Sequence, residues 1–172
     1  MEVIEKKGDA YERREQRFKR WLENVPKWHD HFVYSPNKAT QFTTPSKLLN
    51  SSKAALVTSA GIHLKSQQPF DVISEYGDWS YREIPADTLP GELMISDTHY
   101  DHSDADKDIN CIFPITHIQT LAYEGFIGSV AKNHYSFMGF IPNPKDLILK
   151  TAPEVANLLK KDNVDIVFLT PG

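Results

Sequence analysis

From residue 53 to the end of the chain, short apolar runs alternate with longer amphipathic segments. Residues 53–61 (KAALVTSAG) form an apolar run that closes with a glycine, and residues 164–170 (VDIVFLT) form another, so both are expected to be buried strands. Strands that alternate with helices typically build a parallel sheet covered by helices. The sequence therefore predicts an α/β fold with a mainly parallel sheet, layered as in flavodoxin-like and Rossmann-like proteins.

Three further stretches have the composition of strands. Residues 92–96 (ELMIS) and 126–131 (FIGSVA) are short apolar runs, and residues 81–85 (YREIP) form a weaker run that ends at a proline. In open α/β sheets, ligands bind beyond the carboxyl ends of the strands. The residues that follow each expected strand are therefore the first candidates for function.

Two helices are expected between these strands. The first begins at Pro114, which suits a first turn, and ends near Gly125, which suits a C-terminal cap. Its apolar face is formed by Ile115, Ile118, Leu121 and Ala122. The second begins with Thr151 and Glu154 at the spacing of a capping box. Its apolar face is formed by Val155, Leu158 and Leu159.

The first 52 residues differ from the rest of the chain. Starting between Tyr11 and Asn24, apolar side chains recur at helical spacing within a field of charged residues, which predicts an amphipathic docking helix. These side chains are Phe18, Trp21, Leu22 and Val25. The stretch that follows is punctuated by prolines and has no sustained periodicity, so it is expected to be an irregular arm. We therefore expect an arm over residues 1–52 and a C-terminally incomplete α/β domain over residues 53–172.

Charge and cysteine content exclude several classes of function. The net charge is -4 and the isoelectric point is near 6.0, so no basic field draws the protein onto nucleic acid. The N-terminus is charged from its second residue and no run of about 18 apolar residues occurs, so a cytoplasmic protein without a membrane segment is expected. The single cysteine, Cys111, cannot form an internal disulfide and is expected to be a buried small apolar residue.

The densest polar stretch covers residues 97–110, directly after an expected strand. It contains Asp97, His99, Asp101, His102, Asp104, Asp106, Asp108 and Asn110. One interpretation is a metal site, because DTHYDH differs from the metallo-β-lactamase signature HxHxDH only in having Asp97 at its first position. A calcium loop is set aside, because isoleucines occupy the places of its turn glycine and closing glutamate. A solvated loop whose carboxylates cap turns explains the stretch as well as an active-site loop does.

Two histidines follow other expected strands. His63 lies just beyond residues 53–61, and His134 lies just beyond residues 126–131. Because the carboxyl ends of parallel strands share one edge of the sheet, we expect both histidines, the polar loop and Gly172 to converge there. Histidine exchanges protons readily near neutral pH, so such a convergence would form a candidate site.

Five strings together resemble one family of reductases. They are GIHLKSQQPFD, GDWSYREIP, HYDHSDADKDINCIFPI, GFIGSVAKNHYSFMGFI and VDIVFLTPG. From residue 53 to residue 172 the chain resembles the selenoprotein B family of glycine, sarcosine and betaine reductases and the related small subunit of D-proline reductase. In that family the chain continues past a TP turn into a selenocysteine or cysteine motif. Since selenocysteine is encoded by UGA, we expect Gly172 to be an artificial terminus left by reading that codon as a stop.

The resemblance implies reductive cleavage of a C–N bond in an amino acid or betaine (D-proline, glycine, sarcosine or betaine). It implies a selenolate or thiolate nucleophile, a partner subunit that carries a pyruvoyl group, and a dithiol electron donor; a homo-oligomer is also compatible with it. The supporting residues that we expect, with no metal and no cofactor in this part of the chain, are His63, His99, Asp101, Asp108 and His134. Without the redox residue the polypeptide itself is expected to be inactive. Two alternatives stay open: a metal-dependent hydrolase built on residues 97–102, and a non-catalytic binding subunit.

Overall fold

The computed structural model describes residues 43–171 and a few isolated positions before them. Those positions are Gln16, Lys19, Arg20, Glu23, Asn24, Lys27 and Val33. The expected docking helix and irregular arm therefore fall almost entirely outside the described residues, and their prediction stays untested. Within the described ranges, no helix combines the length and the apolar character needed to cross a membrane.

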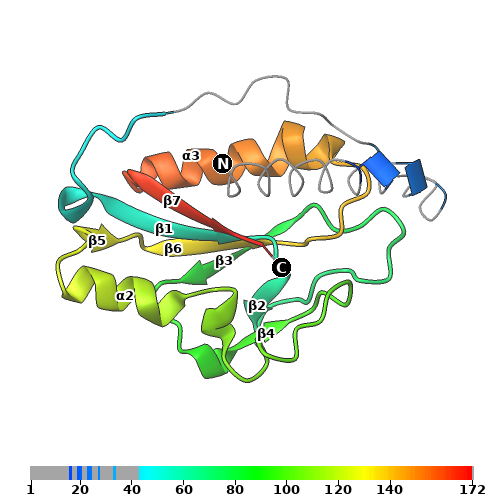
Figure 1. Cartoon of the computed structure of the whole chain (residues 1–172), viewed down its shortest axis with the longest axis horizontal. Helices are drawn as coiled ribbons and strands as arrows, with labels where there is room; N and C mark the ends of the chain where they lie inside the picture. The colour runs from blue at the N-terminus through cyan, green and yellow to red at the C-terminus, as the bar shows by residue number, and fades with distance from the viewer. Residues whose placement is uncertain are drawn as a thin grey trace, which may run out of the picture.

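The centre of the fold is strand β1 (Lys53–Thr58), which has neighbours on both sides. It pairs in parallel with β7 (Ile166–Thr170) on one side and with β5 (Ser129–Val130) and β6 (Asn133–Phe137) on the other. Strand β3 (Tyr81–Pro85) extends the sheet beyond β6 in the antiparallel direction. Figure 1 shows β1, β6 and β7 running side by side toward the same edge. The predicted mainly parallel sheet is confirmed.

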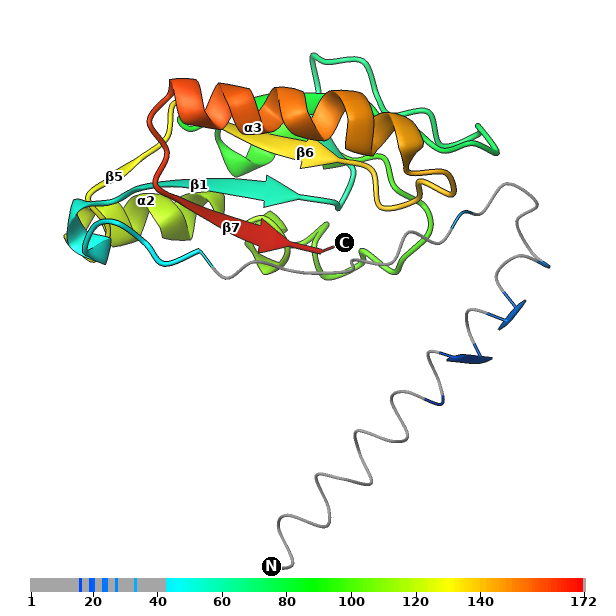
Figure 2. The same cartoon turned by 90° about the horizontal axis from the view of Figure 1, so that it is seen from above.

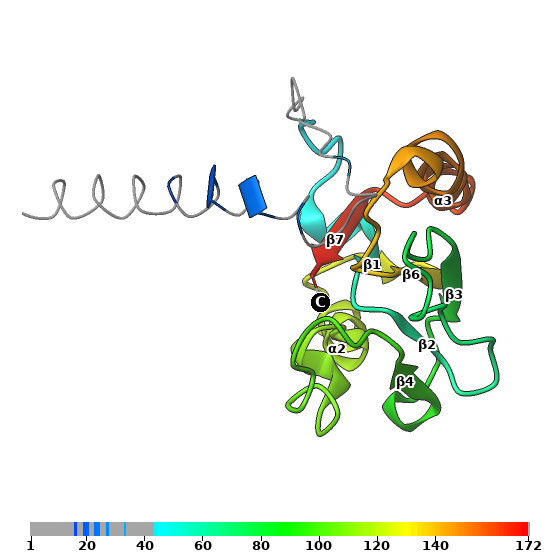
Figure 3. The same cartoon turned by 90° about the vertical axis from the view of Figure 1, so that its right-hand side faces the viewer.

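Two layers cover this sheet, one on each face (Figures 1 and 3). Helix α3 (Ala152–Lys161), continuous with a π-helical turn η4 (Leu147–Thr151), lies on one face. Helix α2 (Ile115–Tyr123) lies on the other, beside a small antiparallel sheet of β2 (Ile62–Leu64) and β4 (Leu93–Ile95). This arrangement confirms the α/β class. Short 3₁₀ helices complete the described part: η1 (Leu49–Ser51), η2 (Pro90–Glu92) and η3 (Ile109–Cys111).

The main core lies between the sheet and the layer that contains α2, β2 and β4. Its buried members are Ala54, Leu56, Ala60, Ile62, Ile84, Leu93, Ile109, Phe113, Ile115, Ile118 and Ile127. Each fully buried Leu, Ile or Phe contributes about 1.5–3 kcal/mol of hydrophobic free energy. Strand β1 reads as a continuous apolar run because both of its edges are paired and both of its faces are covered.

Of the strand expected at residues 126–131, only residues 129–130 form one, strand β5. Strand β5 stops at Val130, and after an outward excursion at Lys132 the chain rejoins β1 as β6. Lys132 leaves the ladder because its backbone N–H donates to the Asp162 carboxylate at 2.8 Å and its carbonyl accepts from Ala86 at 3.0 Å. His134 therefore lies within a strand, not in a loop beyond one, and this part of the prediction is wrong.

Strand β7 is an edge strand, which corrects the expectation that residues 164–170 are buried. Among the described residues it pairs only with β1, and Figure 2 shows it at the margin of the sheet, outside the cover of α3. Leu169 is 78% exposed, and Val167 and Phe168 are also exposed. Its apolar sequence matches a buried strand, but the described structure leaves its outer edge and much of both its faces uncovered.

Both helices form where they were expected, with local differences. Ile115 and Ile118 of α2 are buried, whereas Leu121 is exposed. Thr151 does not form the predicted capping box, because the preceding π-helical turn continues into α3 without a break. Its hydroxyl instead donates to the carbonyl of Trp79 at 2.7 Å. The bond ties the start of α3 to the segment before β3.

Candidate active site

A cavity of about 650 Å³ lies where β1, β6 and β7 end. It is lined by Val57, Thr58, Ser59, Phe137, Met138, Gly139, Ile141, Pro144, Leu147, Ala152, Leu169, Thr170 and Pro171. The lining is largely apolar, and none of these described residues is charged. This is the carboxyl edge of the parallel strands, the place where open α/β sheets bind ligands.

Asp97 lies beside this cavity in the turn that follows β4, and its side chain is buried. Its Oδ1 accepts a hydrogen bond from the backbone N–H of His99 at 2.9 Å, and its Oδ2 accepts one from the N–H of Gly139 at 3.1 Å. A Cβ at Gly139 would lie 2.9 Å from Asp97 Oδ2. A Cβ at Gly61, whose φ is +66°, would lie 2.9 Å from Asp97 Cβ. The carboxylate can therefore approach both turns only because they lack side chains there.

His99 forms an imidazole–carboxylate pair with Asp97, the Nδ1 to Oδ1 distance being 3.0 Å. The imidazole stacks on Phe140, with 4.2 Å between the ring centres and an angle of 9° between the planes. The next residue, Tyr100, donates its hydroxyl to the carbonyl of Ala60 at 3.0 Å, and burial raises its pKa to about 12. The pair is thus fixed at the edge of the cavity, since Gly139 both lines the cavity and binds Asp97.

His63 and His134 do not meet at this edge. His63 lies in β2 and is buried; its Nδ1 donates to the Leu64 carbonyl at 2.8 Å and its Nε2 accepts from Ser96 at 2.7 Å. His134 lies in β6, where its Nδ1 accepts from the N–H of Leu56 at 3.1 Å. Burial lowers the pKa of His134 to about 4. Both side chains tie strands together, so the convergence predicted for them is not what the structure shows.

Two carboxylates of the polar loop cap turns on the surface. Asp101 accepts from the backbone N–H of Ser103 at 3.0 Å, and Asp108 accepts from the N–H of Asn110 at 3.0 Å at the start of η3. The pKa of Asp101 is lowered, mainly by the Ser103 N–H, and that of Asp108 is lowered, mainly by the Asn110 side chain. For these two residues the solvated-loop interpretation describes the geometry.

The geometry of the polar loop does not resemble the metal site considered above. Within the described residues, no three His, Cys, Asp or Glu side chains come together at a distance suited to a metal ion. Both oxygens of Asp97 already accept N–H donors, and His102 forms a separate pair with Asp106 at 2.8 Å. Asp97 and His102 therefore belong to different pairs.

Cys111 is exposed, which corrects the expectation that it is buried. It is the last residue of the 3₁₀ helix η3, in which Ile109 is the buried residue. In a helix with three residues per turn, positions two apart point in different directions. The thiol therefore faces outward.

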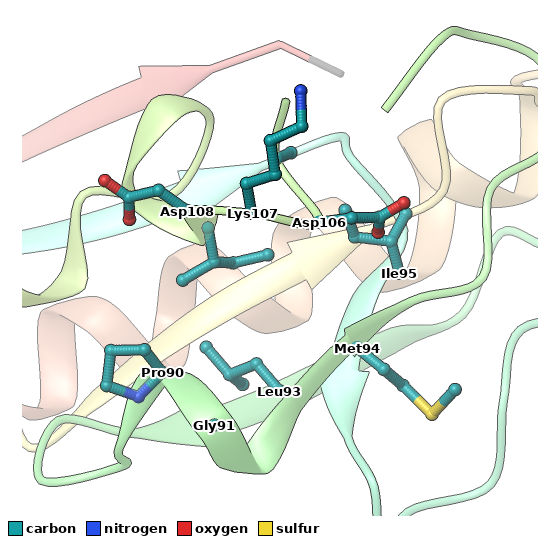
Figure 4. Close-up of a pocket in the computed structure, with 10 residues that line it drawn as sticks. Pro90, Gly91, Leu93, Met94, Ile95, Asp106, Lys107 and Asp108 are labelled. Carbon is teal, nitrogen blue, oxygen red and sulfur yellow. The ribbon is translucent and has the colours of Figure 1, made fainter. Parts of the chain in front are cut away.

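A second pocket, of about 340 Å³, lies beside β4 (Figure 4). Figure 4 shows Lys107 and Asp108 directed away from Leu93 and Met94 on the opposite wall. Lys107 pairs with Asp104 on the surface at 2.9 Å, and Asp108 caps η3. The charged groups of Lys107 and Asp108 are therefore engaged outside this pocket.

Sequence reasoning selected His99 but not Asp97 as a site residue. The signal was present, because Asp97 directly follows an expected strand and stands two positions before His99. The glycines that make room for its carboxylate, Gly61 and Gly139, lie far apart in the sequence and carry no local pattern. The cavity itself is formed by apolar residues from several elements, which sequence spacing alone does not bring together.

Comparison with known proteins identifies the family. The family model for glycine/sarcosine/betaine reductase selenoprotein B matches residues 26–172. The chain is 42% identical over 141 residues to the D-proline reductase subunit gamma of Acetoanaerobium sticklandii, covering 81% of this chain and 57% of that protein. It is 31% identical over 137 residues to the glycine reductase complex component B subunit gamma of Symbiobacterium thermophilum, covering 73% of this chain and 30% of that protein.

The chain thus spans little more than half of the first relative and less than a third of the second. No solved structure matches it. The matched residues include the carboxyl edge with the Asp97–His99 pair, and they confirm the resemblance seen in the sequence. The chain belongs to the glycine/sarcosine/betaine reductase selenoprotein B family.

Proposed function

We propose that this chain forms part of a reductase subunit that cleaves the C–N bond of D-proline. The observation that carries the proposal is the 42% identity to a D-proline reductase gamma subunit over 81% of the chain, against 31% for the glycine reductase relative. Sarcosine and betaine are the other substrates that the family description names. We also propose that the reaction takes place in the cytoplasm.

The apolar cavity at the carboxyl edge supports a ring substrate in preference to glycine. The methylene groups of a pyrrolidine ring gain hydrophobic free energy from contact with such a lining, whereas glycine has no side chain to bury. The described lining residues offer no charged partner to the amino and carboxylate groups of an amino acid. We therefore propose that a pyruvoyl-bearing partner subunit holds those groups.

The nucleophile is proposed to be a selenocysteine or cysteine that follows Gly172. Thr170 and Pro171, the last residues that the structure describes, line the cavity and support this proposal. A selenol is more acidic than a thiol, whose pKa is about 8.5, and is therefore largely ionised at neutral pH. A dithiol donor would restore the reduced state. The polypeptide that ends at Gly172 is then expected to be inactive by itself.

The test is an assay of the full-length gene product together with its pyruvoyl partner. We expect D-proline reduction that depends on dithiothreitol, with lower kcat/KM for glycine, sarcosine and betaine. Substitution of the redox residue by serine should abolish the reaction. Turnover of glycine or betaine in place of D-proline would contradict the substrate assignment. No dithiol-dependent turnover with any of the four would contradict the reductase itself and favour a non-catalytic binding subunit.

A further inference from the structure

Asp97 is a buried carboxylate that is hydrogen-bonded to the imidazole of His99. Burial of an ionised carboxylate costs several kcal/mol unless hydrogen bonds compensate, and replacing buried ion pairs by apolar residues is often neutral or stabilising. Its oxygens accept from the N–H groups of His99 and Gly139, and from the His99 ring. A buried carboxylate at position 97 is therefore explained poorly by a contribution to stability. It is explained better by a role in orienting the His99 ring.

The surroundings of His99 leave one nitrogen for chemistry. Nδ1 is bonded to Asp97, and Phe140 fixes the plane of the ring by stacking. Among residues 43–171, no hydrogen bond engages Nε2, and the side chain is 37% exposed. Tyr100 anchors the following turn to Ala60. A carboxylate on one imidazole nitrogen and a solvent-accessible second nitrogen is the arrangement of a histidine that exchanges protons.

The same loop contains a second histidine–aspartate pair, in which the carboxylate is not buried. His102 Nδ1 lies 2.8 Å from Asp106, but Asp106 is 56% exposed. Among the described residues, neither is hydrogen-bonded to a residue that lines the cavity, whereas Asp97 accepts from the N–H of Gly139. Surface pairs of this kind contribute little energy and do not fix a geometry. The two pairs have the same chemistry and differ in burial and location, so His102 serves as a matched control.

We propose that His99 is a catalytic proton-transfer residue of the reductase, and that Asp97 is a positioning residue that holds its imidazole. This inference rests on the proposed function. In the step assigned to His99, the selenolate or thiolate donates an electron pair to the substrate carbon while the C–N bond breaks and its electron pair passes to nitrogen. Protonated His99 gives its Nε2 proton to that nitrogen. The products are a C–Se or C–S bond, an amine and neutral His99.

The second half of the cycle regenerates both groups. Two thiols of the dithiol donor reduce the C–Se or C–S bond, so that carbon gains a hydrogen, the enzyme regains its selenol or thiol, and the donor becomes a disulfide. When the enzyme chalcogen ionises again, its proton returns to His99. Overall the substrate gains two electrons and two protons, both of which the dithiol supplies.

The experiment measures D-proline reduction by the full-length reductase complex carrying His99→Ala, Asp97→Asn or His102→Ala. Loss of a general acid typically costs at least about 100-fold, so we expect His99→Ala to lower kcat by that factor with KM within about threefold. Added imidazole should restore part of the lost rate. We expect Asp97→Asn to lower kcat about tenfold or more. His102→Ala should leave kcat unchanged.

A pH profile separates positioning from a merely structural role of Asp97. If the protonated imidazole of His99 is the proton donor, kcat should fall on the alkaline side of the profile. Loss of the neighbouring negative charge disfavours the imidazolium, so Asp97→Asn should move this fall to lower pH. The unfolding midpoint of each variant is measured as well, to establish that every variant is folded under the assay conditions.

The outcomes distinguish this inference from the function on which it rests. A wild-type complex that reduces none of the four substrates would overturn the proposed function and the inference with it. An active wild type with a His99→Ala variant that keeps more than half of kcat would overturn the inference alone. So would a His102→Ala defect equal to that of His99→Ala, or no rescue by imidazole together with an unmoved pH profile in Asp97→Asn. A large His99→Ala loss with rescue supports it even if Asp97→Asn fails to fold.

Discussion

The buried polar side chains of this protein have two different roles. His63 and His134 satisfy backbone or side-chain partners inside the fold, and His134 replaces an acceptor that the interrupted strand pairing would otherwise have supplied to Leu56. Asp97 is equally buried, but its partner His99 is 37% exposed. Burial alone therefore does not mark a functional histidine or carboxylate here; the location of its partner does.

The first prediction concerns Gly139, which makes room for Asp97. We expect Gly139→Ala to lower the free energy of unfolding by about 1–3 kcal/mol, because the added Cβ has to displace packed atoms. Those atoms are Asp97 Oδ2 at 2.9 Å and the Ser59 carbonyl at 3.0 Å. Urea denaturation measures the loss, and kcat should fall with it because Asp97 moves.

The matched control is Gly91→Ala, since a Cβ there meets no atom within 4 Å. We expect its free energy of unfolding to stay within about 0.5 kcal/mol of the wild type. Equal stability and activity for the two variants would show that Asp97 is not held tightly against this turn.

The second prediction concerns His134 and pH. Burial lowers its pKa in the folded protein to about 4, whereas an unfolded histidine has a pKa of about 6.5. Between these values the unfolded chain binds the extra proton, so stability is complete above about pH 6.5 and is lost as pH falls toward 4. From pH 7 to pH 5 the loss assigned to His134 is about 2 kcal/mol.

Urea denaturation of wild type and His134→Gln across this range tests the prediction. Glutamine retains an acceptor for the Leu56 N–H but does not titrate. The variant should therefore lose about 2 kcal/mol less between pH 7 and pH 5, whatever its absolute stability. His117→Gln, at an exposed position, should keep the wild-type slope. Parallel slopes for all three proteins would mean that His134 is not held neutral by burial.

At the scale of elements, the periodicity of apolar residues predicted the helices and strands that have a strong local sequence pattern. Strand β1 and helices α2 and α3 formed where their patterns placed them, because each has a strong apolar face or run. The break between β5 and β6 was not predicted because the contacts of Lys132 with Asp162 and Ala86 at this break are between residues distant in sequence. The cavity and the contact of Asp97 with Gly61 and Gly139 are also formed by residues that are distant in sequence. Of the residues in the candidate site, the sequence therefore predicted only His99.

The third prediction concerns the exposed edge strand β7. An exposed apolar edge strand is a site of association between chains. We therefore expect the polypeptide of residues 1–172 to self-associate through β7, and Leu169→Glu to reduce this association. Size-exclusion chromatography with light scattering measures it.

Leu89→Glu is the control for β7, because Leu89 is also largely exposed but lies outside the strands. It should leave the association of the polypeptide unchanged. A monomeric wild-type polypeptide, or equal effects of the two substitutions, would rule out β7 as the site of association.

At the scale of the whole molecule, one edge of the sheet gathers the features that chemistry needs. The ends of β1, β6 and β7 enclose the cavity, and the turn after β4 brings Asp97 and His99 to its margin. The two helical layers cover the faces of the sheet and leave this edge accessible (Figures 1 and 3). The division between a stabilised interior and an accessible carboxyl edge is the general plan of open α/β enzymes.

The position of the proposed redox selenocysteine or cysteine in the full-length protein tests most directly whether this edge is catalytic. An anomalous difference map from crystals of that protein, recorded at the selenium edge or, for cysteine, at long wavelength, locates the atom. We predict a peak at the mouth of the cavity formed by β1, β6 and β7, on the side of His99. A peak at the opposite edge of the sheet, or on the far side of α2, would contradict a catalytic role for this edge.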